Sequence, residues 1–312
     1  MSVTSVEKQA LPVKKGFYRR HRNEFIAYGI MAVPLLWWGV FFLYAFFKAF
    51  VMSFTDWSLA PDLNFLGLDN YIRALKDETV LEAFKNTVIW TVVMLVGVNG
   101  FGIFIASAIN SLRNKTLGKI VLACMFWPTL VSAAASAEIQ KFILGESESG
   151  LINFLLLKMG LIDRPLGWLS NPDIALLGLM ITPFFLGFGI KMIIYYTGIK
   201  NIPGNYYDAA SLETDSKWMV FRHITIPLLR PVIVFNLVLS LIEGFKVIAP
   251  MQLITNGGPL NSTNSVLFAM YTYGITESEM GYGSAIAFLL FLVILAVTVL
   301  QLRLDREKVS YE

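Results

Sequence analysis

The chain has 312 residues, of which 56% are hydrophobic and only 15% are charged. Soluble domains carry roughly 25% charged residues, so this chain has too few charges to cover a water-facing surface. The net charge of +3 is far below the basic excess typical of a nucleic-acid-binding protein. The single cysteine excludes an internal disulfide and a multi-cysteine metal site. The composition therefore indicates an integral membrane protein.

Six apolar stretches predict transmembrane helices, because about 20 such residues are needed to cross the hydrocarbon layer. They are residues 25–47, 86–112, 120–137, 174–190 (continued past Lys191 to 196), 231–254 and 280–302. The predicted fold class is an all-α polytopic membrane protein.

The distribution of Lys and Arg predicts the orientation, since these residues accumulate in cytoplasmic segments. Sixteen of them fall before the first span, between the second and third, between the fourth and fifth, and after the last, whereas six fall in the loops 55–85 and 138–173 on the other side. Both termini are therefore expected in the cytoplasm. The predicted parts are a basic segment at 1–24, a six-helix domain at 25–302 and a tail at 303–312.

The cytoplasmic loop at 197–230 predicts a short helix that begins near Asn205. This residue is expected to be the N-cap, with Asp208 in the first turn, where negative charge suits the helix dipole. Small residues at Ala209 and Ala210 would let another surface approach closely.

A second short helix is predicted at 217–224, with Pro227 and Pro231 ending it and starting the fifth span. The residues alone leave a simpler interpretation open, in which both helices lie on the bilayer surface, anchored by Tyr206, Tyr207 and Trp218.

The loop segment YYDAASLETDSKWMVFRHITIPLLRP (206–231) resembles the signature loop of the permease subunits of binding-protein-dependent ABC importers. In that family the motif begins Glu-Ala-Ala, has Gly four residues after the second Ala, and ends Ile-x-Leu-Pro. Here Asp208 replaces the Glu, Thr214 the Gly and Ile226 the Leu. Thr adopts positive φ poorly, so the turn is expected to differ in shape or the helix to continue through it.

The resemblance implies that this loop is a coupling helix docked into a groove of an ATP-binding subunit. The residues that it assigns to coupling are Tyr207, Asp208, Ala209, Ala210, Leu212, Thr214, Arg222 and Pro227.

Further segments resemble the first permease of the maltose, lactose and glycerol-phosphate importers. They are GLDNYIRALKDETVLEAFKNTVIWT (67–91), LITNGGPLNSTNSVLFAMYTYGI (253–275) and GYGSAIAFLLFLVI (281–294). The resemblance implies the type I ABC importer permease fold in the cell membrane. It also implies a second, homologous permease, two ATP-binding cassette subunits, an extracytoplasmic solute-binding protein and a carbohydrate substrate.

No catalytic constellation is visible, and the phosphate-binding pattern G-x-x-x-x-G-K-[ST] is missing from the sequence. The chain is therefore expected to be no enzyme and to bind no cofactor or metal, with ATP and Mg²⁺ held by the partner ATPases.

Charged and polar residues within spans are candidates for the substrate pathway, because they usually face a cavity or a partner. Glu243 and Lys246, three residues apart, could pair along one helix face, either structurally or beside the path. Asn236 and Ser240 could bond sugar hydroxyls or neighbouring helices. Lys191 is expected to extend toward the cytoplasmic interface.

Other cargoes stay open, namely glycerol phosphate, a uronate oligomer or a peptide. An anionic cargo would favour extra cations in the cavity, for which Lys246 is the candidate. An ATP-independent secondary transporter is a further alternative, although no internal repeat typical of such proteins is visible.

Overall fold

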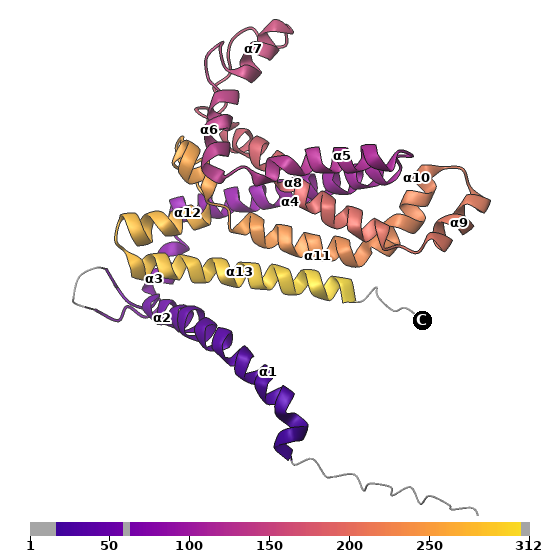
Figure 1. Cartoon of the computed structure of the whole chain (residues 1–312). Coiled ribbons are helices and arrows are strands. Elements are labelled where there is room, and N and C mark those ends of the chain that lie inside the picture. Colours follow the sequence, from indigo (N-terminus) through magenta and orange to yellow (C-terminus); the bar gives the residue numbers. More distant parts are fainter. Residues whose placement is uncertain (1–16, 59–62, 307–312) are drawn as a thin grey trace, which may run out of the picture. The chain divides into compact units, whose positions relative to one another are not determined.

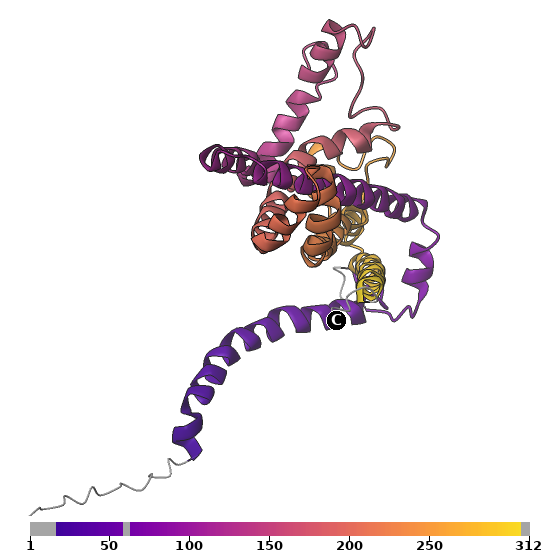
Figure 2. The same cartoon turned by 90° about the vertical axis from the view of Figure 1, so that its right-hand side faces the viewer.

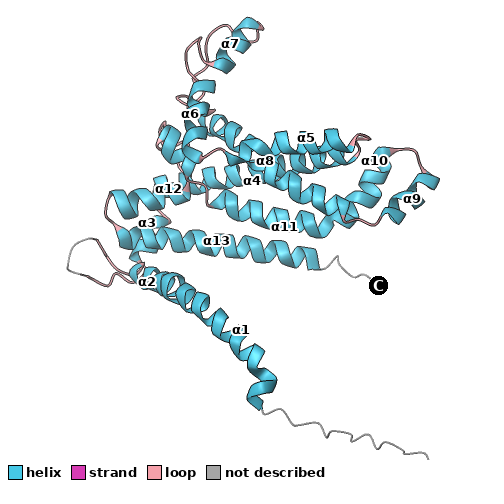
Figure 3. Cartoon of the chain, viewed as in Figure 1, coloured by secondary structure: helices cyan, strands magenta, loops and turns pink. Residues whose placement is uncertain are grey.

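The computed structural model describes residues 17–58 and 63–306. Within these ranges all regular elements are helices, beside one isolated bridge between Thr55 and Phe65 (Figure 3), which confirms the all-α class. Residues 1–16 of the predicted N-terminal segment and 307–312 of the tail lie outside the described ranges.

The helices are α1 (Phe17–Trp38), η1 (Gly39–Leu43), α2 (Tyr44–Met52), α3 (Asp69–Ala74), α4 (Glu78–Asn110), α5 (Lys115–Phe126), η2 (Trp127–Leu130), α6 (Ala133–Ile143), α7 (Leu151–Lys158), α8 (Ala175–Lys200), α9 (Gly204–Glu213), α10 (Lys217–Val220), η3 (Phe221–Thr225), α11 (Ile226–Phe245), η4 (Met251–Thr255), α12 (Val266–Tyr271), η5 (Thr272–Thr276) and α13 (Met280–Arg306).

The chain divides into two units, residues 1–51 and 52–312. The first unit contains a continuous helical run through α1, η1 and most of α2. The apolar run Ile26–Met52, which ends one residue beyond this unit, is long enough to cross a membrane and covers the predicted first span except Phe25.

Four helical runs of the second unit are also long and apolar enough to cross a membrane: Glu78–Asn110, Ala175–Lys200, Lys217–Phe245 and Met280–Leu304. They lie side by side in both views (Figures 1 and 2). They correspond to the second, fourth, fifth and sixth spans predicted from the sequence.

The predicted third span, 120–137, is not one straight helix. Lys115–Leu130 and Ala133–Ile143 meet at an angle of 97°. Pro128 has no amide to donate within the helix, and Ser132 begins a new helix by accepting a hydrogen bond from the amide of Ala135 at 3.3 Å. The described residues therefore contain five helical runs long and apolar enough to cross a membrane, or six if the bent pair is one span.

The predicted fifth span is also shorter than expected, because α11 ends at Phe245 instead of continuing to Ile254. Lys246 caps the helix, and a wide π-turn follows at Met251–Thr255. Pro250 lacks the amide that a continued helix would need at that position.

Helix α4 forms the centre of the second unit, since all three buried apolar clusters include its side chains. Val80 packs with α12 and α13, Trp90 with α8 and η4, and Val98 with α8 and α11. The approach of α11 is close, because a Cβ atom at Gly244 would lie 2.8 Å from the side chain of Thr91.

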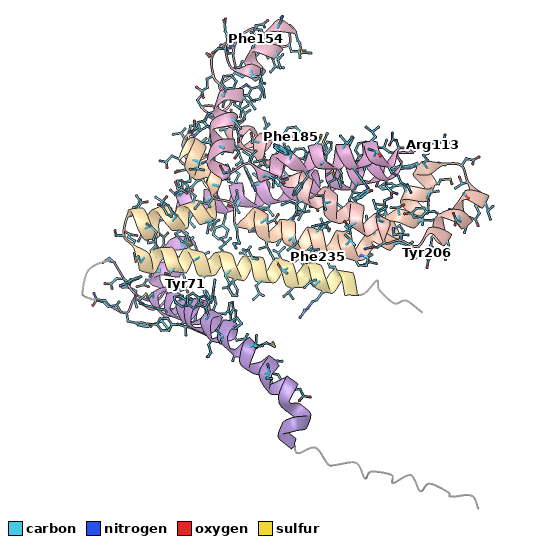
Figure 4. All side chains as sticks on the ribbon, in the orientation of Figure 1. Tyr71, Arg113, Phe154, Phe185, Tyr206 and Phe235 are labelled. Carbon is cyan, nitrogen blue, oxygen red and sulfur yellow. The ribbon has the colours of Figure 1, made fainter. Side chains whose placement is uncertain are left out.

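The second unit has two distinct ends. Helices α9 and α10 lie at the end where α4 joins α5 and where α13 finishes, whereas α3 and α12 lie at the other end (Figure 1). Arg113 and Tyr206 mark the first end, and Phe154 marks the tip of the α6–α7 projection (Figure 4). The three basic segments around 113–119, 197–230 and 303–306 thus share one end.

Candidate functional site

The predicted coupling helix is present as α9. It begins at Gly204, one residue before the predicted N-cap, because Pro203 (ψ 136°) supplies the extended residue that leads into the helix. Asn205 therefore lies inside the helix, and Asp208 falls beyond the first turn. The capping and first-turn predictions for these two residues were wrong, although the helix was predicted correctly.

One face of α9 holds the helix to its own chain. Tyr207 and Ala210, three residues apart, share this face. Ala210 is buried, and the hydroxyl of Tyr207 hydrogen bonds with the hydroxyl of Thr225 at 3.2 Å. These two predicted coupling residues therefore anchor α9 to the start of the fifth span.

The opposite face of α9 is free of the chain. Asp208 and Ala209 are exposed, and 89% of Leu212 is accessible. Arg222 and Pro227 on the following helix are exposed as well. This face of α9 is therefore accessible to another protein.

The turn after α9 uses the side chain of Thr214. Its backbone is extended (φ −154°, ψ 140°), so no positive φ is required and Thr fits without strain. Its hydroxyl accepts a hydrogen bond from the amide of Ser216 at 3.1 Å, and the Ser216 hydroxyl accepts one from Met219 at 3.4 Å. The sequence left two outcomes open, a turn of different shape or a helix that continues through it. The turn of different shape is observed, because α9 ends at Glu213.

The second short helix does not end where the prolines were expected to end it. α10, η3 and α11 form one run of 29 residues, Lys217–Phe245. In the π-turn the amide of Ile226 bonds to the carbonyl of Phe221, five residues back. This wider turn makes room for the ring of Pro227, which would otherwise crowd the carbonyl four residues before it.

A cavity of about 570 Å³ separates this loop from the end of α4. Its walls include Phe104 and Ser107 of α4, Tyr207 of α9, and Trp218 and Phe221 of the following run. The cavity is therefore bounded by α4 on one side and by the loop and the start of the fifth span on the other.

A second cavity, of about 360 Å³, lies within the bundle and is called the central cavity below. It is lined by Trp90, Met94, Val98, Val131, Ala133, Ser136, Ala137, Gln140, Pro183, Leu186, Gly187, Ser240, Glu243, Gly244, Val247, Ala249, Pro250 and Ile254. Mostly apolar walls with a few polar groups are typical of small-molecule sites. Both interrupted spans contribute to it, as expected if irregular backbone at membrane depth lines a cavity.

The four residues predicted for a substrate pathway separate into two pairs. Ser240 and Glu243 line the central cavity. Asn236 is fully buried and Lys246 is exposed, and neither lines the cavity.

The predicted pairing of Glu243 with Lys246 was wrong. The ammonium of Lys191 lies 3.0 Å from one carboxylate oxygen of Glu243 and 3.2 Å from the other. Lys246 caps the end of α11, so it lies outside the regular helix on which the i, i+3 spacing depends. Lys191 is buried between helices and does not extend to an interface.

A hydrogen-bonded chain that sequence reasoning missed joins three spans beside the central cavity. The hydroxyl of Tyr195 on α8 donates to Asn99 on α4 at 2.6 Å, and the Asn99 amide donates to Ser240 on α11 at 2.9 Å. Gln140, also missed, is buried and donates to the carbonyl of Gly178 at 2.7 Å. A polar residue within an apolar run was the available signal for Asn99 and Tyr195.

Residues 98–309 match the family described as binding-protein-dependent transport system inner membrane component. This stretch covers more than half of the chain. The chain belongs to that family.

Two curated relatives match the sequence of this chain over most of their length. The arabinooligosaccharides transport system permease protein AraP of Bacillus subtilis (strain 168) is 33% identical, over 85% of this chain and 84% of that protein. The multiple sugar-binding transport system permease protein MsmF of Streptococcus mutans is 28% identical, over 93% of this chain and 98% of that protein.

A solved structure shares the fold of this permease. It belongs to a bacterial ABC transporter involved in the import of the acidic polysaccharide alginate. The TM-score is 0.82, with 95% of this chain and 100% of the other covered, and the sequences are 19% identical. At this identity the likeness shows the ABC importer permease fold alone.

At the end of the permease remote from α9, Asp77 caps α4 and joins it to α13. One carboxylate oxygen accepts from the amide of Thr79 at 2.9 Å. The other accepts from the hydroxyls of Tyr273 and Tyr282, each at 2.9 Å. Arg73 lies 3.9 Å from the centre of the Tyr282 ring.

Burial alone would raise the pKa of Asp77, but the hydrogen bonds from the two tyrosines and from the amides of Val80 and Thr79 outweigh it and lower the pKa. Burial, together with the neighbouring carboxylate of Asp77, raises the pKa of Tyr273 to about 12. Asp77 is therefore held as a carboxylate that accepts from neutral hydroxyls. Among the described residues, no group of three or more His, Cys, Asp or Glu is arranged to hold a metal ion.

Proposed function

We propose that this permease is one of two homologous transmembrane subunits of an ABC importer that moves an oligosaccharide across the cell membrane. The carrying observation is the exposed face of α9, formed by Asp208, Ala209 and Leu212 at a loop end. Membership of the family supports a permease role. The oligosaccharide and sugar named for the two relatives support the cargo class.

In this proposal two ATP-binding cassette subunits dock on the α9 end, which is cytoplasmic together with both chain termini. ATP and Mg²⁺ are held and used on those subunits, and an extracytoplasmic binding protein delivers the sugar at the opposite end. The shared location of the basic segments supports this orientation, since Lys and Arg accumulate on the cytoplasmic side.

The central cavity is the proposed part of the substrate path in this chain. Glu243 offers an exposed carboxylate to this cavity, whereas Trp90 and Ser240, which also line it, are largely buried. A mostly apolar wall with a few polar groups suits a sugar ring, which has apolar faces and hydroxyl edges.

Coupling follows from helix continuity. α9 is anchored to Thr225 through Tyr207, and Thr225 belongs to the run Lys217–Phe245 that carries Glu243 into the cavity wall. A displacement of α9 by the closing ATPases is thereby passed to one helix that reaches the substrate path. This is a two-state rigid-body coupling of the kind known in switching proteins.

The test is co-purification of the ATPase subunits with Ala209→Arg. The added side chain projects from the exposed face, so we expect at least a tenfold loss of captured ATPase and of sugar uptake. Ala135→Arg, at an exposed alanine of α6, is the matched control and should retain the ATPase. Full ATPase capture with full uptake in Ala209→Arg would contradict docking on this face, and uptake without any ATPase would favour a secondary transporter.

A further inference from the structure

The charge on the wall of the central cavity is negative. Among the described residues that line it, Glu243 alone carries a formal charge, and Ser136, Gln140 and Ser240 are neutral polar groups. The side chain of Glu243 is 65% exposed. A carboxylate is therefore the charged group that a molecule in this cavity meets from this chain.

The countercharge is present but enclosed. The Lys191 ammonium contacts both oxygens of Glu243, at 3.0 and 3.2 Å, while its own side chain is 4% exposed. Lys191 does not line the cavity.

The stem of Lys191 is enclosed by α4. At Gly102 of α4, a Cβ atom would lie 3.4 Å from the Cβ of Lys191 and 3.3 Å from the amide nitrogen of Met192. α4 therefore packs directly over the base of the lysine, which leaves its ammonium directed to Glu243.

This arrangement treats neutral and anionic saccharides differently. Each carboxylate oxygen has more than one lone pair, so Glu243 can hold the Lys191 ammonium and still accept from a sugar hydroxyl. The carboxylate of a uronic acid would approach a like charge and be repelled by it. Lys246, the cation expected for an anionic cargo, lies outside the cavity lining.

We infer that the Lys191–Glu243 pair makes this permease select neutral, polyhydroxylated saccharides over anionic ones. The inference rests on the proposed function, and it removes the uronate oligomer and glycerol phosphate from the open cargoes. In it Glu243 contacts the cargo, and Lys191 is a positioning residue that fixes the carboxylate without touching the cargo.

The experiment measures saccharide affinity of the complete importer in lipid nanodiscs by isothermal titration calorimetry, with ATP and hydrolysis-deficient ATPases and without the binding protein. The probes are neutral trisaccharides (arabinotriose, maltotriose and cellotriose) and anionic ones (trigalacturonate and trimannuronate). We expect the wild type to bind a neutral probe at least tenfold more tightly than any anionic probe.

Glu243→Gln keeps the shape and removes the charge, so the neutral-to-anionic affinity ratio should fall at least fivefold. If this variant fails to assemble because Lys191 is left buried and unpaired, Lys191→Met with Glu243→Gln removes both charges and should show the same fall. Glu82→Gln, at a surface acid near Lys85, is the control and should keep the wild-type ratio.

An unchanged ratio in the assembled Glu243 variants, or a wild type that prefers an anionic probe or binds none, would overturn the inference. The proposed function is tested by a separate measurement. With active ATPases, the binding protein should stimulate ATP hydrolysis by the importer. Stimulation with an unchanged ratio would refute the charge selection alone, whereas no stimulation and no saccharide binding would refute both.

Discussion

At the N-terminus of α4, Asp77 uses both carboxylate oxygens, one for the first amides of its own helix and one for Tyr273 and Tyr282. One side chain thus satisfies helix-end donors that have no partner within the helix and joins α4 to segments about 200 positions away in the sequence. The lowered pKa of Asp77 means that the folded protein favours its charged form.

The sign of the resulting pH dependence follows from this direction. A carboxyl group with a lowered pKa in the folded state stabilises the fold above its unfolded pKa of about 4. That stability is lost as the pH falls through the folded pKa.

We therefore predict that Asp77→Asn weakens the decline of the apparent unfolding temperature between pH 5 and pH 3. Asn is nearly as good an N-cap as Asp, whereas Asp77→Ala should lower stability at pH 7 by about 1–2 kcal/mol because the cap is lost. The measurement is thermal unfolding of the detergent-solubilised importer, monitored by intrinsic fluorescence at each pH. Asp163→Asn, in the exposed α7–α8 connection, should leave the curve unchanged; an identical decline in Asp77→Asn would refute the role of its charge.

Among the elements, the α9–α10 turn shows a side chain taking over a role that glycine fulfils through its backbone. The hydroxyl of Thr214 accepts from Ser216, and Ser216 in turn caps α10. The turn is therefore held by two successive side-chain caps, with no residue in the left-handed region.

This arrangement predicts that Thr214→Gly loosens the turn although glycine is the family residue. Loss of one hydrogen bond costs about 1 kcal/mol, which corresponds to roughly fivefold faster amide exchange in the segment 210–219. Thr214→Ser retains the hydroxyl and should exchange at the wild-type rate. Hydrogen–deuterium exchange of the purified importer makes the comparison, and equal rates in the Gly and Ser variants would show that the hydroxyl has no part in the turn.

For the whole molecule, the proposed function assigns communication between the α9 end and the central cavity to the continuous run from α10 through η3 to α11. Insertion of two glycines after Thr225 should interrupt this run, since glycine weakens helices by about 1 kcal/mol per residue. We expect the ATPases still to co-purify, with sugar transported per ATP reduced at least tenfold in proteoliposomes. The same insertion after Glu146, in the exposed loop between α6 and α7, should leave the ratio unchanged; full coupling in the first variant would exclude transmission through this helix.

Much of the fold could be predicted from apolar length, because a stretch such as 280–302 is a helix wherever its neighbours lie. The interruptions of the third and fifth spans could not be predicted in this way. Pro128 is a helix-ending signal and Ser132 a helix-starting signal inside an otherwise apolar stretch. A criterion based on apolar length alone treats both as part of one span. The same applies to Pro250, whose effect depends on the backbone leaving the helix four residues earlier.

The candidate site was likewise predictable from the sequence only in part. The position of α9 could be predicted from its residues and its resemblance, but the separation of Tyr207 and Ala210 from Leu212 depends on which face meets Thr225. Spacing along one helix suggested Lys246 as the partner of Glu243. The actual partner, Lys191, is 52 positions away, and only the packing of α8 against α11 brings it near.

The early end of α11 places Glu243 in the last helical turn, three residues before Lys246. The carbonyl groups at a helix C-terminus carry the negative end of the helix dipole, which disfavours a carboxylate there and favours a cation. The ion pair with Lys191 offsets the cost of placing a carboxylate at this helix end. The buried lysine and the interrupted span are thus linked through Glu243, because a span continued to Ile254 would place this carboxylate in mid-helix, without the unfavourable helix end.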